Sequence, residues 1–358
     1  MGSPVIDRAG RWFLRSGIQD ALGGVARYYR SDLERNNPVS TEITGYAASA
    51  LAYLHSVTGE AQYLERALLA ARFLARTAWN APLDIIPFEY GPSPNGSGPQ
   101  AYFFDCGIIV RGLLAVWRAT GERELLEAAV RCGRAMARDF AAGADYHPIL
   151  LLPSKQPLAR EPRWSRSSGC YQLKSAMAWH DLSEATGDAE FERHYRRVLE
   201  YSLRTYDAFL PGDPDPNQVM DRLHAFSYFL EGMLPAAQEC RAAIRDGLAR
   251  VASHLRQIAP SFARSDVYAQ LLRARLYAEW AGVAPLDRAA AEEEAAELAR
   301  FQCEHRDPRI DGGFWFGRRS GNWLPYVNPV SAAFALQALE LWRQYLAGCS
   351  PAHRHALI

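Results

Sequence analysis

Three near-copies of a short motif limit how this chain can fold. The motif reads Thr-Gly followed by an acid, and its copies begin at Thr58, Thr120 and Thr186. Each copy follows a long apolar segment and precedes an amphipathic one. Glycine at such a point commonly ends a helix in the left-handed conformation, and acids suit the first turn of the next helix. The motif therefore predicts helical hairpins that recur along the chain, and a degenerate fourth copy surrounds Gly282.

A second repeat relates the two ends of the chain. Gly-Gly pairs at 23–24 and at 312–313 are each followed by a Pro-Val-Ser motif, which ends at Ser40 and at Ser331. Each motif opens a long segment rich in Ala, Leu and aromatic residues. We expect both serines to be helix N-caps, because their hydroxyl oxygens can accept hydrogen bonds from free backbone N–H groups.

Twelve helices are expected, six strongly apolar and six more amphipathic. The apolar segments lie near 40–57, 104–119, 169–185, 221–238, 265–281 and 329–346. The amphipathic segments lie near 3–16, 60–77, 122–140, 188–207, 239–257 and 286–302. A helix that is apolar around most of its circumference is buried, so the first set is expected to form an inner layer.

This alternation predicts an all-α protein, an (α/α)6 barrel in which six helical hairpins form inner and outer rings. Each hairpin can bury its faces only against its neighbours, so the ring must close, and hardly any regular strand is needed. An open α-solenoid is the alternative, but it would have short connections on both faces, whereas short and long connections alternate here. We expect one domain over residues 1–358, closed by pairing of the N-terminal helix with the last inner helix.

Composition narrows the classes of partner. Hydrophobic residues make up 49% of the chain and charged residues 22%, which is typical of a globular protein. The 40 Lys and Arg residues balance the 40 Asp and Glu residues, so no global basic field would hold nucleic acid or an anionic membrane. No secretory leader and no apolar run of about 18 residues is evident. These observations predict a cytoplasmic protein without nucleic-acid or membrane partners.

Three long proline-rich connections predict the position of the site. They span 78–103, 141–168 and 208–220, and each leads into the N-terminus of an apolar helix. Long ordered loops gathered on one side of a rigid scaffold are usually functional. Helix N-termini add free N–H groups and a positive dipole end. We therefore expect a binding or catalytic site on the rim formed by these loops.

The Thr-Gly-acid joints and the helix alternation resemble the six-hairpin glycosidase-like superfamily. Its members include unsaturated glucuronyl and rhamnogalacturonyl hydrolases, other glycoside hydrolases and the related N-acylglucosamine 2-epimerases. The resemblance covers nearly the whole chain and implies an (α/α)6 barrel acting on carbohydrate. The joints indicate the fold and carry little information about the chemistry. The Gly-Gly turns also resemble those of terpene-cyclase-type barrels, but the Asp-rich motifs of those enzymes are missing.

Glycoside hydrolysis requires a protonated carboxyl and a second carboxylate across the sugar. Glu42, Asp105 and Asp221 fall at or near the starts of apolar segments, and Glu89 lies on a preceding loop. His224 follows Asp221 by three residues, a spacing that suits a proton-transfer pair on one helix face. Structural roles are the alternatives: complementation of the helix dipole, a buried Asp–His hydrogen bond, or a loop hydrogen bond.

Candidate substrate contacts are aromatic, cationic and amide side chains on the same rim and on the Gly-rich loop before the last helix. Aromatic faces suit the apolar side of a sugar ring, and arginines suit acidic sugar groups. Structural ion pairs are the alternative for the buried cations, and plugging of the barrel for the tryptophans. The candidates are Tyr29, Tyr46, Tyr90, Arg111, Trp164, Tyr171, Lys174, Arg222, Arg273, Trp315, Arg318, Trp323 and Asn328.

The leading hypothesis is a glycoside hydrolase-like enzyme that uses two of the four acids on a small, possibly acidic, saccharide or oligosaccharide. The alternative is a sugar epimerase or isomerase of the N-acylglucosamine 2-epimerase type. Similar epimerases use two histidines, and here His224 is the one that clearly lies at an inner mouth, with His147 as a candidate second base. The third hypothesis is a non-catalytic saccharide-binding or scaffold barrel. No phosphate-loop, nucleophile-elbow, zinc or calcium motif appears, so no cofactor and no metal are expected.

Overall fold

The helices end where the sequence places glycine in the Thr-Gly-acid joints. The computed structural model describes residues 4–91, 98–143, 145–161, 163–349 and 353–358. Gly59, Gly121 and Gly187 are left-handed, with φ of 75°, 72° and 75°. Each donates its N–H to the carbonyl four residues earlier, which closes the last turn. The predicted joints are confirmed.

Twelve α-helices account for most of the described part of the chain, and the strands between them are only two or three residues long. The prediction of an all-α protein is confirmed. Among the described residues, no helix combines the length and the apolar character that a membrane span needs.

The chain forms two compact units. The N-terminal unit consists of Gln19–Arg27 and Asn37–Thr205. The C-terminal unit consists of Met1–Ile18, Tyr28–Asn36 and Tyr206–Ile358. A single domain over residues 1–358 stays a prediction.

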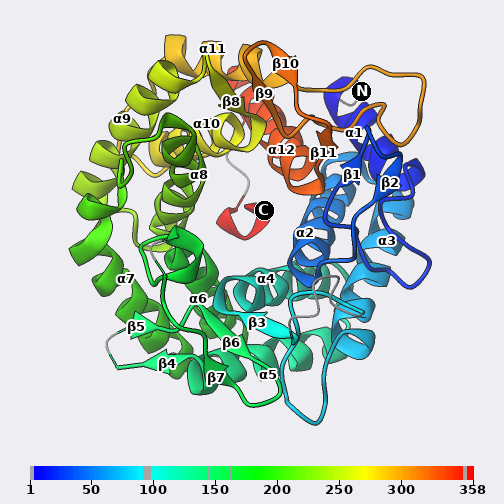
Figure 1. The fold of residues 1–358 in the computed structure, drawn as a ribbon, viewed down its shortest axis with the longest axis vertical. Coiled ribbons are helices and arrows are strands. Elements are labelled where there is room, and N and C mark those ends of the chain that lie inside the picture. Colours follow the sequence, from blue (N-terminus) through cyan, green and yellow to red (C-terminus); the bar gives the residue numbers. More distant parts are fainter. Residues whose placement is uncertain (1–3, 92–97, 144, 162, 350–352) are drawn as a thin grey trace. The chain divides into compact units, whose positions relative to one another are not determined.

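The N-terminal unit is a layer of packed helical hairpins (Figure 1). Helix α2 packs against α3 and α4, and α4 packs against α5 and α6. A π-helical stretch, Phe73–Thr77, continues α3. The helices are α2 (Thr41–Thr58), α3 (Ala61–Arg72), α4 (Phe103–Thr120), α5 (Arg123–Asp139), α6 (Gln172–Thr186) and α7 (Ala189–Phe209), the last belonging to this unit up to Thr205.

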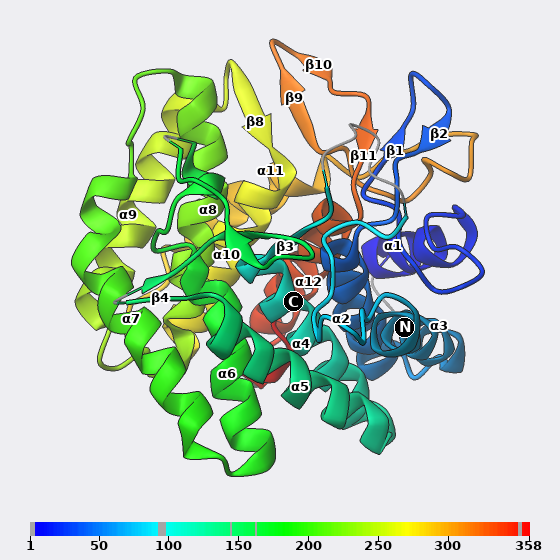
Figure 2. The same ribbon diagram turned by 60° about the horizontal axis from the view of Figure 1, so that its bottom comes forward.

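The loops of this unit contain short antiparallel strands. These strands lie at the end of the unit where α2, α4 and α6 begin (Figure 2). Strand β6 lies between β3 and β7, and β4 pairs with β5. In this sheet, Gln100 lies opposite Leu151 and Tyr102 opposite Ile149. The strands are β3 (Gln100–Tyr102), β4 (Ala141–Ala142), β5 (Asp145–Tyr146), β6 (Ile149–Leu151) and β7 (Gln156–Pro157), followed by a 3-10 turn at Trp164–Arg166.

In the C-terminal unit, α10 packs against α8, α11 and α12, and α1 packs against α12. Two three-stranded sheets, in the orders β10-β9-β8 and β11-β1-β2, hold its loops. The helices are α1 (Pro4–Arg15), α8 (Pro216–Gly232), α9 (Arg241–Ile258), α10 (Ser265–Trp280), α11 (Arg288–Ala299) and α12 (Pro329–Leu346). The strands are β1 (Tyr29–Arg30), β2 (Arg35–Asn36), β8 (Phe262–Arg264), β9 (Gly317–Arg319), β10 (Asn322–Trp323) and β11 (Tyr326–Val327).

Burial follows the predicted division into apolar and amphipathic helices. Nearly every residue from Phe103 to Leu114 of α4 is buried, and α10 and α12 are buried to a similar extent. Helix α5 buries mainly one face, through small and sulfur-containing residues such as Ala129, Cys132 and Met136. The segments that are apolar all round therefore form the core of each unit.

One predicted helix start and one predicted helix cap are wrong. Helix α8 begins at Pro216 rather than near 221, because the Asp215 side chain caps the Asn217 N–H and proline suits the first turn. Asp221 therefore lies in the second turn. Helix α12 is capped by Asn328, whose side chain accepts from the Val330 N–H at 2.8 Å, so Ser331 lies inside the helix. The predicted cap at Ser40 is confirmed.

Candidate functional site

Glu42 and Asp105 come together at the starts of two adjacent helices of the N-terminal unit. Glu42 is the second residue of α2, and Asp105 is the third residue of α4. Asp105 is 5% exposed, and Glu42 is half-buried. The two carboxyl groups are near enough for the charge of Glu42 to raise the pKa of Asp105.

Glycine contacts between the helices create this proximity. A Cβ atom on Gly112 would lie 2.5 Å from the carbonyl oxygen of Gly45, and one on Gly45 would lie 3.0 Å from the carbonyl oxygen of Ile108. The backbones of α2 and α4 therefore touch. Glu42 lies about one turn before Gly45, and Asp105 lies about two turns before Gly112, so both side chains reach the same end of the helix pair.

Burial makes both acids hard to ionise. It raises the pKa of Glu42 to about 7, and the Arg27 guanidinium opposes this rise. Burial also raises the pKa of Asp105 well above its usual range, with a further rise from Glu42 and an opposing effect of Arg27. The Asp105 Oδ2 atom is buried and has no hydrogen-bond partner among the described residues. The pair therefore retains a proton near neutral pH.

Arg27 is held beside this pair by backbone pairing. Its N–H donates to the Pro38 carbonyl at 3.1 Å, and the Ser40 N–H donates to the Val25 carbonyl at 3.1 Å. The Arg27 guanidinium lies 5.1 Å from the centre of the Phe88 ring. Residues 25–27 thus run antiparallel to the chain that enters α2.

Aromatic residues directly precede Asp105 in the chain, and further rings pack against them. Tyr102, the N-cap of α4, lies 4.9 Å from Phe88 between ring centres. Phe104 lies 6.1 Å from Tyr171, and Tyr171 packs edge-on against Trp164 at 5.1 Å. Burial raises the pKa of Tyr171, whose hydroxyl donates to a backbone carbonyl. These rings give the site apolar surfaces of the kind that stack on sugars.

The proline-rich loop that carries Glu89 lies against the start of α2. Glu89 forms an antiparallel bridge with Ser40, and the Tyr90 N–H donates to the Val39 carbonyl at 3.2 Å. Tyr90 is 42% exposed, and its ring lies 5.1 Å from that of Phe73. Glu89 and Tyr90 therefore lie beside the start of α2, near Glu42. We call the surface formed by the starts of α2 and α4 and by residues 88–90 the mouth of the site.

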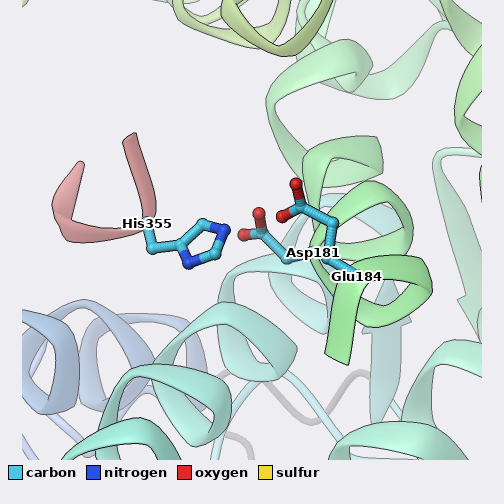
Figure 3. Close-up of side chains that lie close together, drawn as sticks. All are labelled: Asp181, Glu184 and His355. Carbon is cyan, nitrogen blue, oxygen red and sulfur yellow. The ribbon is translucent and has the colours of Figure 1, made fainter. Parts of the chain in front are cut away.

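Three other predicted residues of this unit lie in its interior. Arg111 forms an ion pair with Asp181 at 3.0 Å, and both side chains are buried, which matches the structural alternative for Arg111. Asp181 and Glu184 lie about one turn apart on α6, and Figure 3 shows them at its C-terminal end. Tyr46 and Lys174 are buried as well, with Lys174 fully inaccessible.

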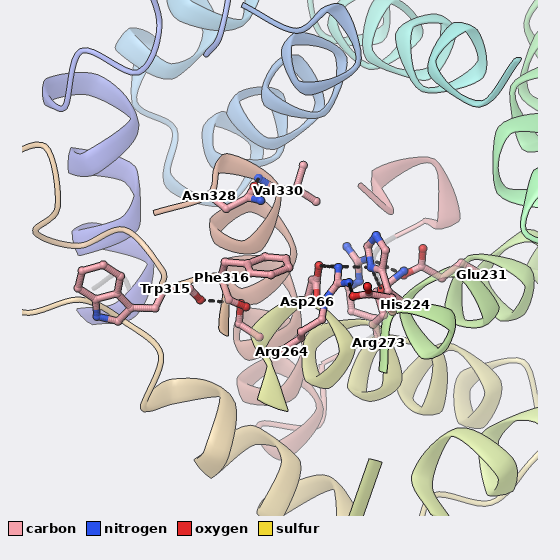
Figure 4. A network of polar contacts seen from close by, with 12 residues as sticks. His224, Glu231, Arg264, Asp266, Arg273, Trp315, Phe316, Asn328 and Val330 are labelled. Atoms are coloured by element: carbon pink, nitrogen blue, oxygen red, sulfur yellow. Dashed lines mark hydrogen bonds and ion pairs between the residues drawn. The ribbon is translucent and has the colours of Figure 1, made fainter. Parts of the chain in front are cut away.

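A second polar cluster occupies the C-terminal unit, around the starts of α8 and α10 (Figure 4). Arg264 bridges two acids: Nη1 donates to Asp221 at 2.6 Å, and Nη2 donates to Asp266 at 2.6 Å. Asp221 therefore pairs with Arg264 rather than with His224, and the predicted Asp221–His224 pair does not form among the described contacts. The two acids hold Arg264 fully charged.

His224 is held as a neutral imidazole in this cluster. Its Nδ1 atom lies 2.8 Å from the Gln270 Oε1 and 3.4 Å from the Asp266 Oδ2. Burial lowers the pKa of His224, with opposition from the Asp266 carboxylate. A neutral ring that donates through Nδ1 leaves a lone pair on Nε2, so Nε2 can accept a proton.

The predicted arginines of this unit make structural contacts. Arg273 is fully buried, donates to Glu231 and Gln337, and lies 4.0 Å from the Phe334 ring centre. Arg222 donates to the Phe209 carbonyl at 3.1 Å and lies 5.2 Å over the ring of the same residue.

The predicted tryptophan pair forms a near-parallel stack. Trp315 and Trp323 lie 6.5 Å apart with 16° between their planes, and Trp323 is 39% exposed. Arg318 lies over Trp323 at 5.6 Å. Asn328 caps α12, and Tyr29 is buried in β1.

The candidate site residues chosen from the sequence did not include Arg27, Phe88 and Tyr102 around the acid pair, or Arg264 in the second cluster. Arg27 follows the Gly23-Gly24 turn that the repeat marks, and Tyr102 directly precedes an apolar helix. Both positions can be recognised in the sequence, so both residues could have been chosen as candidates. Arg264 occupies the equivalent position before α10, as its N-cap.

Structural comparison places this architecture among known folds. No protein-family model matches the sequence, and a sequence search of curated proteins gives no match. A sugar epimerase from a ruminal bacterium aligns over 93% of this chain and 96% of its own, at 11% identity and a TM-score of 0.72. Cellobiose 2-epimerase from Spirochaeta thermophila aligns over 95% of both chains, at 15% identity and a TM-score of 0.70.

A family 76 glycoside hydrolase from a bovine Bacteroides thetaiotaomicron strain is also similar. It aligns over 96% of this chain and 78% of its own, at 12% identity and a TM-score of 0.61. At these identities the likeness concerns the fold. The chain therefore shares the all-α, (α/α)6-barrel fold of these structures.

Proposed function

We propose that this protein is a carbohydrate-active enzyme that hydrolyses glycosidic bonds, with Asp105 and Glu42 as its catalytic carboxyl groups. One observation carries the proposal: the half-buried Glu42 and the buried Asp105 lie together at adjacent helix starts, where burial raises the pKa of both carboxyl groups. Glycoside hydrolysis needs one protonated and one ionised carboxyl beside the scissile bond, and two neighbouring acids that differ in burial can supply them.

Asp105 is the general acid in this proposal. It is the more buried of the two, it lies next to a second acid, and its Oδ2 has no described partner. The proton therefore resides on Asp105, which transfers it to the glycosidic oxygen as the bond from that oxygen to the anomeric carbon breaks.

Glu42 supplies the carboxylate. It is more exposed than Asp105, and the Arg27 guanidinium favours its ionised form. The Glu42 carboxylate has two possible roles. It can take a proton from the water that attacks the anomeric carbon, or it can bond to that carbon itself; in the second case water then breaks this bond and gives a proton to Asp105, which has already passed its own proton to the leaving group. Phe88 and Tyr102, which are both partly exposed, offer rings for the sugar.

The test is hydrolysis of oligosaccharides by the purified full-length protein, followed by detection of new reducing ends. The Asp105→Asn variant should bind the same oligosaccharide and release no reducing ends. Glycosides with activated leaving groups need little acid assistance, so this variant should recover part of the wild-type rate on them. Equal loss on activated and natural substrates would contradict the role of Asp105 as acid.

A second candidate function is a sugar epimerase or isomerase, and His224 favours it. Its neutral ring is oriented by Gln270 and Asp266, so Nε2 can remove a proton from a carbon beside a carbonyl. Several similar structures are described as sugar epimerases, which adds support.

Solvent deuterium separates these functions. Proton removal and return in D2O would place deuterium on a sugar carbon, whereas glycoside hydrolysis leaves carbon-bound hydrogens unlabelled. Labelling that is lost in His224→Asn would favour the epimerase. Saccharide binding with neither hydrolysis nor labelling would favour a non-catalytic barrel.

A further inference from the structure

Arg27 is unusual among the arginines near the candidate sites because no described carboxylate forms an ion pair with it. Arg111 pairs with Asp181, Arg264 with Asp221 and Asp266, and Arg273 with Glu231. The described contact of the Arg27 guanidinium is instead the face of Phe88 at 5.1 Å. Its N–H groups thus have no described acceptor, and the residue is exposed.

The position of Arg27 is nevertheless fixed. Backbone hydrogen bonds join its own N–H to Pro38 and the neighbouring Val25 carbonyl to the Ser40 N–H, directly before α2. Phe88 is fixed in turn, because its carbonyl accepts from the Thr41 N–H at 3.1 Å. The guanidinium is therefore presented to solvent at the mouth that holds Glu42, and it is not a free surface side chain.

A second exposed arginine lies on the same mouth. Arg163 directly precedes Trp164 in the chain. The Trp164 ring packs on Tyr171, which in turn lies against Phe104 next to Asp105. Arg163 has no ion pair among the described residues, whereas nearby Arg166 pairs with Glu161 at 2.6 Å. Burial raises the pKa of Tyr102, and the positive charges of Arg27, Arg163 and Arg166 oppose this rise, so all three lie within electrostatic range of its hydroxyl.

The two acids do not cancel this positive charge. Because they retain a proton between them near neutral pH, they contribute about one negative charge rather than two. The mouth thus combines the acid pair, the side chain of Glu89, aromatic rings and two arginines without described ion-pair partners.

We propose that the saccharide bound at the Glu42–Asp105 site is anionic, carrying a uronic carboxylate or a sulfate ester, and that Arg27 binds this group with Arg163 beside it. The inference rests on the proposed function, since it names the substrate class of the same site. When a guanidinium stacks on an aromatic ring, the N–H groups at its edge stay free to form hydrogen bonds. Two of them can donate parallel hydrogen bonds to one anionic group.

The test is calorimetric binding to the full-length Asp105→Asn variant, which holds ligands without cleaving them. The probes are oligosaccharides of uronic acids, each paired with its carboxyl-reduced form, and sulfated oligosaccharides, each paired with its desulfated form. At least one anionic probe should bind tenfold or more tightly than its neutral partner. Whether the carboxylate or the sulfate series does so identifies the group.

Adding Arg27→Gln should abolish this preference and change the affinity for the neutral probe less than twofold. Arg27→Lys should keep part of the preference, because the charge remains and the paired donors are lost. Arg131→Gln is the matched control: Arg131 also stacks on an aromatic ring, 4.7 Å over Trp79, and carries none of the site contacts. It should leave the preference intact.

Equal binding of every anionic probe and its neutral partner would overturn the inference, as would a preference that survives Arg27→Gln. These results are separable from failure of the proposed function. An Arg27-dependent preference without hydrolysis by the wild-type protein would retain the anion site and reject the hydrolase. Hydrolysis by the wild-type protein without any difference in affinity between the anionic probes and their neutral partners would retain the hydrolase and reject the anion site.

Discussion

Gly112 of α4 lies directly against Gly45 of α2, so that a Cβ atom on Gly112 would meet the Gly45 carbonyl oxygen at 2.5 Å. This contact lets the two helices approach closely enough for Glu42 and Asp105 to influence each other. The geometry of the acid pair therefore depends on a residue two turns away that has no side chain.

Gly112→Ala should destabilise the protein by about 1–3 kcal/mol, because overpacking between the two helices outweighs the gain of about 1 kcal/mol in helix propensity. Chemical denaturation measures this change. Gly98→Ala is the control, because the nearest atom to its added Cβ lies at an ordinary 3.7 Å. If Gly112→Ala is as stable as the wild type, the helices are not held at this contact.

The stability of the protein should depend on pH through Glu42. Its pKa rises from an ordinary 4.5 to about 7 on folding, so between these values the folded protein binds more protons than the unfolded chain. Stability therefore falls as pH rises through this window. Glu42→Gln removes that loss, and should gain about 1–3 kcal/mol over the wild type at pH 8 and almost nothing at pH 4.

Urea unfolding at the two pH values checks this prediction. Glu65→Gln, an exposed site on α3, serves as the control and should show the same difference from wild type at both. A Glu42→Gln variant with an equal stability change at pH 4 and pH 8 would mean that folding leaves the pKa of Glu42 near its ordinary value.

The buried pair of Glu231 and Arg273 should be costly to break. Both side chains are fully inaccessible, so Glu231→Gln leaves a buried guanidinium without its counter-charge. The expected loss is about 3–5 kcal/mol. The exposed pair of Arg123 and Glu127 provides the contrast, because Glu127→Gln should cost less than about 1 kcal/mol. Similar losses for both variants would contradict this assignment of burial.

The fold could be predicted from the sequence because its determinants are local. The left-handed glycines at 59, 121 and 187 end helices through backbone conformation alone, and segments that are apolar all round report burial directly. The errors at α8 and α12 have the same local character. In both cases a side chain before a proline, Asp215 or Asn328, caps the helix ahead of the residue that was expected to start it or cap it.

The candidate site could be predicted only in part, because it depends on contacts between segments far apart in the chain. Glu42 and Asp105 were both candidates, but their pairing follows from the Gly45–Gly112 contact, which no sequence pattern reports. The role of Arg27 likewise depends on the loop that carries Phe88. The sequence also predicted a pair of Asp221 and His224. In the structure Asp221 accepts a hydrogen bond from Arg264, and His224 contacts Asp266 and Gln270 instead.

Oligosaccharide turnover by Glu42→Gln and Asp105→Asn tests whether these two acids are the catalytic pair, with binding measured on the same proteins. Each substitution should lower kcat by about a hundredfold or more, since each removes one carboxyl from the pair, while the affinity for the oligosaccharide should change little. Glu89→Gln, at the same mouth, should retain activity. If either variant of the pair hydrolyses its substrate at the wild-type rate, Glu42 and Asp105 are not the catalytic pair.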